Sequence, residues 1–260
     1  MKANKCRLIL DPPLCGAVNM AKDHAVLHGV SHNELPPTLR ISSWVEPTVT
    51  IGCFENPKDT VNKDFCKKRK IPVIRRESGG GTVLHHIELC YSFTIPLHSE
   101  LIPQSVDESF RKIISPLLNT LKVFLNGVEY RPLNDIIINK RKISGSAQLR
   151  KYGTLQQHGT VIIDIDDEIF ASAIYYDEQI LLSRGFSSPR QSLTSLREEV
   201  GQDMNERFIE DFVISIINCF SKEFNIEFID SDITDFEKDT MDKFVKKFNA
   251  DVWKTKKQKA

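Results

Sequence analysis

Residues 75–86 read Arg-Arg-Glu-Ser-Gly-Gly-Gly-Thr-Val-Leu-His-His, and they are the most informative stretch of this 260-residue chain. Three successive glycines stand between two strand-like runs, so the backbone can take positive φ angles and its amides can approach a ligand closely. The two arginines ahead of them can bind a carboxylate or a phosphate. The spacing is neither GxxxxGK[ST] nor GxGxxG, so the stretch is not one of these nucleotide-binding loops. A flexible hairpin turn with two solvated arginines is the alternative interpretation.

Two further polar clusters follow along the chain. Asn134 and Asp135 open a strand-like run, and Lys142 comes about one hairpin later in Lys-Ile-Ser-Gly-Ser-Ala. Small residues around a lysine leave room for a ligand, and the ammonium can stabilise negative charge on a phosphoryl or carbonyl oxygen. A solvated turn lysine is the alternative. The third cluster, Gln-His-Gly-Thr at 157–160, lies at the entry of the next strand-like run.

The elements around these clusters predict an α+β fold. Strand-like runs occupy residues 38–45, 48–54, 73–76, 83–96, 135–138 and 159–165. Helical spacing appears in residues 17–30, 58–70, 105–125, 168–176, 205–224 and 234–249. Two helix starts, Ser105 with Glu108 and Thr234 with Glu237, match the capping box. Because several strands follow one another without regular β-α-β alternation, we expect a mixed or antiparallel sheet flanked by helices.

Composition limits the classes of function. The chain has 35 Lys and Arg against 35 Asp and Glu, and 40% of its residues are hydrophobic, as in an ordinary globular protein. A net charge of zero provides no field that would attract a polyanion, so nucleic acid and membrane are not expected partners. The sequence has no run of about 18 apolar residues, and its first residues show neither the apolar region nor the cleavage site of a signal peptide, so we expect none. The six cysteines form no CxxC pair, which is typical of reduced thiols, and we expect a cytoplasmic protein.

Taken in order and spacing, six pieces of the chain resemble the lipoate-protein ligase A family, within the fold of the biotin and lipoate protein ligases. The pieces are PTVTIG (47–52), RRESGGGTVLHH (75–86), RPLND (131–135), RKISGSAQ (141–148), QHGT (157–160) and SPRQSLTSL (188–196). The resemblance implies a single catalytic domain over residues 1–260, in which about 234–260 form a terminal helix and a basic tail. The C-terminal accessory domain of full-length family members is not expected here.

The resemblance also implies a two-step enzyme. Lipoate and ATP give lipoyl-adenylate and pyrophosphate, and the lipoyl group then passes to a lysine of a lipoyl domain. The expected acceptors are the E2 subunits of 2-oxoacid dehydrogenase complexes and the H protein of the glycine cleavage system. Bipartite ligases supply the accessory domain as a separate small polypeptide, so a small accessory subunit is a candidate partner. Whether octanoate is used as well as lipoate stays open.

The roles of the family fall on particular residues of this chain. Lys142 is the implied catalytic residue, which contacts both the carboxylate and the phosphate. The implied binding residues for ATP and lipoyl-adenylate are Arg76, Gly81, Thr82, Val83, Leu84 and Lys142. Secondary candidates are Gly79, Gly80, Asn134, Asp135, Ser144, Gly145 and His158. Asp135 is also the candidate ligand for Mg²⁺, which carries charge on pyrophosphate.

Two expectations concern the shape of this site. Gly80 and Gly81 should tolerate no side chain, because the amides of the turn must approach phosphate closely. Cations are needed because a carboxylate must reach a second anion, and an apolar tunnel is needed for the acyl chain. We expect Trp44, Val73 and Val83 among its walls.

Octanoyl transfer on the same fold, with a cysteine nucleophile and without ATP, is the main alternative function. In those relatives the thiol lies shortly before the lysine motif or after the strand of the QHG type, and residues 91–218 contain no cysteine. This argues against an acyl-thioester enzyme. The stretch RLILDPPLCGAVNMAKDHAVL (7–27) nevertheless looks like the cysteine-type relatives. Transfer from preformed lipoyl-adenylate, a ligand pocket without catalysis, and a zinc site at His85, His86 and His158 are further alternatives.

Overall fold

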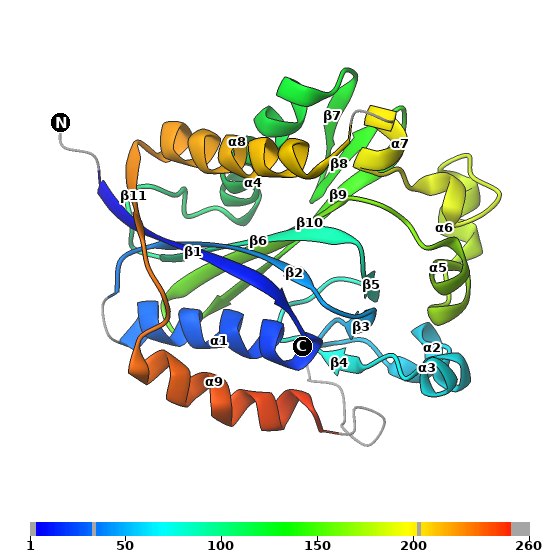
Figure 1. Ribbon diagram of the computed structural model, residues 1–260, viewed down its shortest axis with the longest axis horizontal. Coiled ribbons are helices and arrows are strands. Elements are labelled where there is room, and N and C mark those ends of the chain that lie inside the picture. Colours follow the sequence, from blue (N-terminus) through cyan, green and yellow to red (C-terminus); the bar gives the residue numbers. More distant parts are fainter. Residues whose placement is uncertain (1–3, 33–34, 202–203, 251–260) are drawn as a thin grey trace.

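The computed structural model describes residues 4–32, 35–201 and 204–250, and its largest element is an eight-stranded sheet (Figure 1). From edge to edge the strand order is β11-β1-β2-β6-β10-β9-β8-β7. β1 pairs in parallel with both β11 and β2, and the remaining neighbours are antiparallel. The strands are β1 (Asn4–Leu14), β2 (Thr38–Trp44), β6 (Glu88–Pro96), β7 (Val128–Arg131), β8 (Asp135–Ile138), β9 (Arg141–Lys151), β10 (Thr154–Ile162) and β11 (Ile226–Asp230). The predicted mixed sheet of an α+β fold is confirmed.

A small second sheet carries the glycine turn. Its order is β4-β3-β5, built from β3 (Thr48–Ile51), β4 (Val73–Arg75) and β5 (Val83–His85). The strand predicted over 83–96 is therefore two strands in two sheets. The helix predicted over 58–70 is also divided, into α2 (Pro57–Thr60) and α3 (Lys63–Arg69), because Val61 forms a β-bridge with Ile174 and Asn62 caps the second helix.

Helices cover both faces of the large sheet (Figure 1). α4 (Val106–Phe124) and α8 (Glu206–Phe224) lie on one face, and α1 (Gly16–His32) lies on the other with α9 (Asp235–Phe248) packed outside it. Between β10 and α8 the chain forms three shorter helices, α5 (Asp167–Ala173), α6 (Glu178–Ser183) and α7 (Leu196–Val200). No helix in the described ranges is long and apolar enough to cross a membrane.

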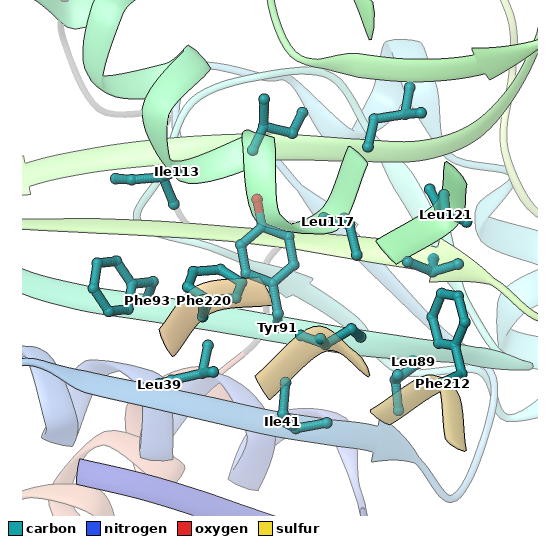
Figure 2. Close-up of a cluster of buried hydrophobic side chains, with 14 of the residues drawn as sticks. Leu39, Ile41, Leu89, Tyr91, Phe93, Ile113, Leu117, Leu121, Phe212 and Phe220 are labelled. Carbon is teal, nitrogen blue, oxygen red and sulfur yellow. The ribbon is translucent and has the colours of Figure 1, made fainter. Parts of the chain in front are cut away.

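The main core fills the space between the sheet and the α4–α8 pair. Figure 2 shows apolar side chains of β2 and β6, among them Ile41 and Phe93, facing Leu117 of α4 and Phe220 of α8. The predicted helical spacing of 105–125 and 205–224 places these residues on the buried faces, as amphipathic helices require. Burial of each large apolar side chain stabilises the fold by roughly 1.5–3 kcal/mol. This core fixes the sheet on which the site is built.

The opposite face of the sheet buries charge. The guanidinium of Arg40 on β2 contacts Asp11 at 2.6 Å and Asp23 of α1 at 2.7 Å, and Lys22 contacts Asp11 at 2.5 Å. Burial alone would raise the pKa of Asp23, but the charge of Arg40 and the nearby His158 hold it below its usual value. α1 therefore stays buried although its sequence carries polar residues on the side that faces the sheet.

The predicted terminal helix is confirmed as α9, and its start is a complete capping box. Thr234 Oγ1 accepts from the amide of Glu237, whose Oε2 accepts from the amide of Thr234 at 2.7 Å. The fully buried Glu237 also accepts two hydrogen bonds of 2.9 Å from Arg7 on β1. At Ser105 the structure has the first half of the predicted box, a bond from the amide of Glu108. The predicted basic tail, 251–260, lies outside the described residues.

We predict that Glu237→Gln lowers the free energy of unfolding by about 3 kcal/mol, because it leaves the buried guanidinium of Arg7 without its charged partner. Asp239→Asn, on the exposed side of the same helix, is the matched control. Urea denaturation with a shared m-value measures both. Equal stability of the two variants would show that the buried pair does not anchor the helix.

Candidate active site

A cavity of about 280 Å³ lies between the glycine turn, the large sheet and the first half of α1. The predicted residues that line it are Arg76, Gly80, Gly81, Thr82, Val83, Leu84, Asn134, Lys142, Gly145 and His158. Of the other predicted residues, Gly79, Asp135 and Ser144 are not among the described residues of the lining. The fold thus brings the three polar clusters of the sequence to one cavity.

Arg76 shapes the glycine turn from within. Its Nη2 donates to the carbonyl oxygens of Gly79 at 2.8 Å and Gly81 at 2.7 Å, and its other nitrogens donate to Thr50 and Ser78. Burial lowers the pKa of Arg76 to about 10, which leaves it charged at neutral pH. Since every arm of the guanidinium ends on a protein acceptor, Arg76 organises the turn. Its direct contact with ATP stays a prediction.

Gly80 is the position of the turn that needs glycine. Its φ of +90° is unfavourable for a side chain, and its carbonyl oxygen lies against Gly52, where any Cβ would overlap it. The PTVTIG piece of the sequence therefore ends in a glycine that makes room for the turn. At Gly81 a Cβ would meet no atom within 4 Å. The predicted intolerance is thus supported at Gly80, whereas at Gly81 the fold itself does not require it.

A β-bulge presents Lys142 to the cavity. The register between β8 and β9 shifts between Ile136 and Ile137, which pair with Ser144 and Lys142, so one extra residue re-aims the lysine. Its stem folds across Gly145, where a Cβ would lie 2.5 Å from Lys142 Cε. This explains the glycine of the KISG motif. The Lys142 side chain is one-third exposed (33%), and its ammonium has donors left for a ligand.

Asp135 forms an ion pair with the ammonium of Lys142 and fixes its position. Its Oδ1 lies 2.8 Å from Lys142 Nζ, and its Oδ2 lies 2.8 Å from Arg131 Nη2. Burial alone would raise the pKa of Asp135, but these two cations hold it below its usual value. Both oxygens are thus engaged, so the carboxylate is not free for Mg²⁺ in this arrangement, and its metal role stays a prediction. Asn134, directly before β8, bonds to the neighbouring strand β9, because its Nδ2 donates to Ser146 O at 2.5 Å.

The SPRQSLTSL piece fixes the backbone of the lysine segment. Leu193 forms a β-bridge with Lys142, and the amide of Thr194 donates to the Lys142 carbonyl at 2.9 Å. Arg141 forms ion pairs with Glu198 and Glu199 just beyond that piece. The last of the six sequence pieces therefore holds the backbone of Lys142, the candidate catalytic residue, in place.

His158 connects the turn to α1. Its Nε2 lies 2.8 Å from Ser78 Oγ, and its Nδ1 lies 3.6 Å from Asp23 Oδ2. The order Ser-His-Asp suggests a catalytic triad, but Ser78 is only 2% exposed and does not line the cavity, and it accepts a bond from Arg76. A buried hydroxyl cannot reach a substrate. The hydrogen-bonded chain of Ser78, His158 and Asp23 therefore positions the turn.

On one side of the cavity lies a second series of hydrogen-bonded polar side chains, which the sequence did not predict. Trp44 Nε1 donates to Cys90 Sγ at 3.0 Å, Cys90 contacts Glu88 at 3.3 Å, and Glu88 pairs with His85. Burial raises the pKa of the Cys90 thiol well above its usual value, and the Glu88 carboxylate raises it further. His85, Glu88 and Cys90 are close in sequence, whereas Trp44 comes from β2, so only the fold brings the four side chains together.

These side chains also bear on the zinc hypothesis. His85, Glu88 and Cys90 offer ligand atoms within 4.8 Å of one another, and they are the group of metal-ligand type found among the described residues. His158 belongs instead to the Ser78 chain. The alternative of a zinc site at His85, His86 and His158 finds no support among the described residues, because His85 and His158 belong to different hydrogen-bonded chains.

The apolar part of the lining belongs to two separate packing clusters. Met20 and Trp44 pack with Cys90 in one cluster, whereas Ile174 packs with Leu84 and Tyr176 in the other. The hydroxyl of Tyr176 is buried and has no hydrogen-bond partner among the described residues. Of the three predicted tunnel residues, Trp44 and Val83 line the cavity. Val73 is not among the described lining residues, although its side chain packs in the second cluster.

Comparison with known proteins shows which family this sequence matches. The family model of the lipoyl protein ligase A/B catalytic domain matches residues 15–221. The octanoyltransferase LipM of Clostridioides difficile (strain 630) is 30% identical over 275 residues, covering 98% of this chain and all of that protein. The octanoyltransferase LipM of Staphylococcus aureus is 29% identical, covering 92% of this chain and 94% of that protein.

Two solved structures share the fold. A bipartite lipoate protein ligase, from a study of the archaeal lipoylation system of Thermoplasma acidophilum, superposes with a TM-score of 0.81 at 23% identity over 96% of both chains. A lipoate-protein ligase A bound with ATP gives a TM-score of 0.77 at 21% identity over 97% of this chain and 98% of that one. Because the family model spans most of the sequence and a curated relative aligns over nearly its whole length, this chain belongs to the family of lipoyl protein ligase A/B catalytic domains.

Proposed function

We propose that this chain attaches lipoate to a lysine of lipoyl domains by way of a lipoyl-adenylate made from ATP. The coarser activity, lipoyl or octanoyl transfer, is supported by the family and by the names of the curated relatives. The observation that carries the finer proposal is the ammonium of Lys142, which Asp135 holds at a cavity with two separate apolar sides.

The chemistry needs a cation at this point. In the first step a carboxylate oxygen of lipoate attacks the α-phosphorus of ATP, and pyrophosphate leaves. In the second step the lysine nitrogen of the acceptor attacks the acyl carbon, AMP leaves, and the nitrogen loses a proton. Both steps gather negative charge between the acyl group and the α-phosphate. Lys142 can neutralise this charge without moving, because Asp135 and the bulge already orient it.

The dimensions of the sheet fit the acyl arm of such an adenylate. Gly145 on β9, Thr160 on β10 and Cys90 on β6 pair directly across the sheet. Adjacent strands lie about 4.8 Å apart, so roughly 10 Å separates the lysine hairpin from the thiol, enough for an extended chain of eight carbons. The side formed by Met20, Trp44 and Cys90 would receive the acyl arm.

The adenosine arm would take the other side of the cavity. Leu84, Ile174 and Tyr176 form an apolar wall there, beside Thr82, whose hydroxyl donates to Thr60 at 2.7 Å. A flat base suits an apolar wall that holds one unpaired hydroxyl. Mg²⁺ would carry charge on the pyrophosphate. Because Asp135 is engaged in two ion pairs, we assign no step to a metal at that residue.

The proposed acceptors are lipoyl domains, both of E2 subunits and of the glycine cleavage H protein. The solved archaeal relative supports this part of the proposal, because it was studied with its E2 lipoyl domain. That relative is described as bipartite, so a separate small subunit is part of the proposal. If adenylation depends on such a subunit, this chain alone would transfer lipoate from preformed lipoyl-adenylate.

Octanoyl transfer without ATP is the second candidate function, and the names of the curated relatives favour it. Among the described residues that line the cavity, Cys90 is the one thiol that could carry an acyl thioester. Its sulfur would have to lose a proton and attack the acyl carbon of a carrier thioester, with the carrier thiolate leaving. The acceptor lysine nitrogen would then attack the same carbon, lose a proton and displace the Cys90 thiolate. The raised pKa of Cys90 disfavours the thiolate that the first step needs.

We predict that Lys142→Ala lowers both adenylate formation and acyl transfer by 100-fold or more, about 3 kcal/mol of barrier, while the fold stays intact. Lys140→Ala, an exposed lysine two residues away, is the control and should keep full activity. Pyrophosphate release and lipoyl-domain modification report the two steps. Retention of more than about a tenth of the activity in Lys142→Ala would remove this lysine from the mechanism.

The adenylate route predicts that Cys90→Ala keeps most of the transfer activity per folded molecule, and that replacing all six cysteines does the same. Intact-mass analysis after incubation with octanoyl carrier protein should show no acyl adduct. Cys53→Ala serves as the control, because Cys53 is buried outside the cavity lining. An adduct that appears on the wild type and disappears in Cys90→Ala would instead establish the thioester route.

Tyr176→Phe should raise the KM for ATP by roughly two- to tenfold, the value of one neutral hydrogen bond, if the unpaired hydroxyl contacts the base. The same change should leave the stability of the free protein unchanged or higher, because the buried hydroxyl has no protein partner. The exposed Tyr175 provides the matched control Tyr175→Phe. Steady-state kinetics and thermal unfolding measure the pair, and an unchanged KM in Tyr176→Phe refutes the assignment.

A further inference from the structure

Glu77 lies inside the glycine-rich stretch, directly between Arg76 and Ser78, and the proposed chemistry gives it no role. Its side chain is only 8% exposed. Three nitrogens from three different elements converge on it: Lys247 Nζ of α9 at 2.6 Å, Lys151 Nζ of β9 at 2.9 Å and His24 Nδ1 of α1 at 3.1 Å. A single carboxylate thus joins two helices and a strand to the turn.

The charge of Glu77 is maintained by these contacts. Burial alone would raise its pKa, but the contacts from His24, Lys247 and Lys151 hold the pKa of this carboxyl far below its usual value. The side chain is therefore an anion at neutral pH, where it pairs with the ammonium groups of Lys247 and Lys151. Arg76 donates hydrogen bonds to carbonyl groups of the turn from the cavity side, while Glu77 pairs with Lys247 of α9 on the other side.

The helix that supplies Lys247 is itself fixed at its other end. Glu237 in the first turn of α9 pairs with Arg7 on β1, and Lys247 in the last turn pairs with Glu77. Between them the ring of Phe244 packs on His24 with centroids 3.6 Å apart, and Lys247 lies 4.9 Å above the same ring. Figure 1 shows α9 running along α1 towards the small sheet. α9 therefore links β1 at its first turn to Glu77, beside the glycine turn, at its last turn.

We infer that Lys247, acting through Glu77, is a positioning residue for the glycine turn, and that α9 thereby sets the affinity of the turn for the phosphates of the nucleotide. This inference rests on the proposed function. Glycine-rich backbone loses much conformational entropy when it orders, and phosphate can be bound by the amides only once they point at it. An anchored Glu77 orders the adjoining residues 78–80 before the nucleotide arrives, so binding need not order them.

The matched pair Lys247→Met and Lys246→Met tests the inference in the full chain, because Lys246 is exposed and adjacent on the same helix. We expect Lys247→Met to raise the KM for ATP by roughly fivefold, with kcat and the KM for lipoate unchanged. Lys247→Arg should restore the wild-type value, because it retains the ion pair. Glu77→Gln, which weakens all three contacts, should have the larger effect in the same direction.

Two results would overturn the inference. One is equal KM values for ATP in Lys247→Met and Lys246→Met. The other is a parallel fall of kcat, lipoate affinity and thermal stability in Lys247→Met, which would mean that the ion pair only stabilises the fold. Hydrogen exchange of the amides of residues 77–82 gives an answer that does not depend on activity. If the wild type releases no pyrophosphate, the proposed function fails, whereas the positioning role still requires faster exchange in Lys247→Met than in Lys246→Met.

Discussion

The buried guanidinium of Arg76 is the interaction on which the site depends. Three glycines in a row have no preferred shape, and the arginine supplies one by binding the carbonyl oxygens of Gly79 and Gly81. With its carbonyl groups directed at Arg76, the turn can offer its amides to the cavity. The cost of burying this charge is offset because every arm of the guanidinium has an acceptor. The opposite face of the turn is anchored by Glu77 and His158.

Much of this arrangement could be predicted from the sequence, because its parts are short and local. The glycine stretch, the lysine motif and the QHG piece do meet at one cavity, and the terminal helix starts at the capping box of Thr234. β9 could not be predicted as a strand, because its small polar residues lack apolar alternation. The ion pairs of Glu77 join residues from distant segments, because Lys247 lies 170 residues further along the chain. In the polar chain through Glu88, His85 and Cys90 are close in sequence, and only Trp44 comes from a distant strand.

Two functions share this fold, and they differ in how the acyl group is activated. A transferase needs a thiolate at the reacting carbon, whereas a ligase needs cations that bring two anions together. In this chain the cation is present at the cavity as Lys142. The one thiol of the described lining, Cys90, is hydrogen-bonded to Glu88 and has a raised pKa. The raised pKa of Cys90 supports the proposed ligase activity, whereas the names of the curated relatives favour transfer without ATP.

The most direct test of this account is the intact mass of a lipoyl domain after incubation with the protein and each candidate acyl donor. The account predicts a lipoyl adduct when lipoate, ATP and Mg²⁺ are supplied together, or when lipoyl-adenylate is supplied in their place. It predicts no adduct from octanoyl carrier protein without ATP. An octanoyl adduct formed from the carrier protein alone, with none formed from lipoyl-adenylate, would contradict it.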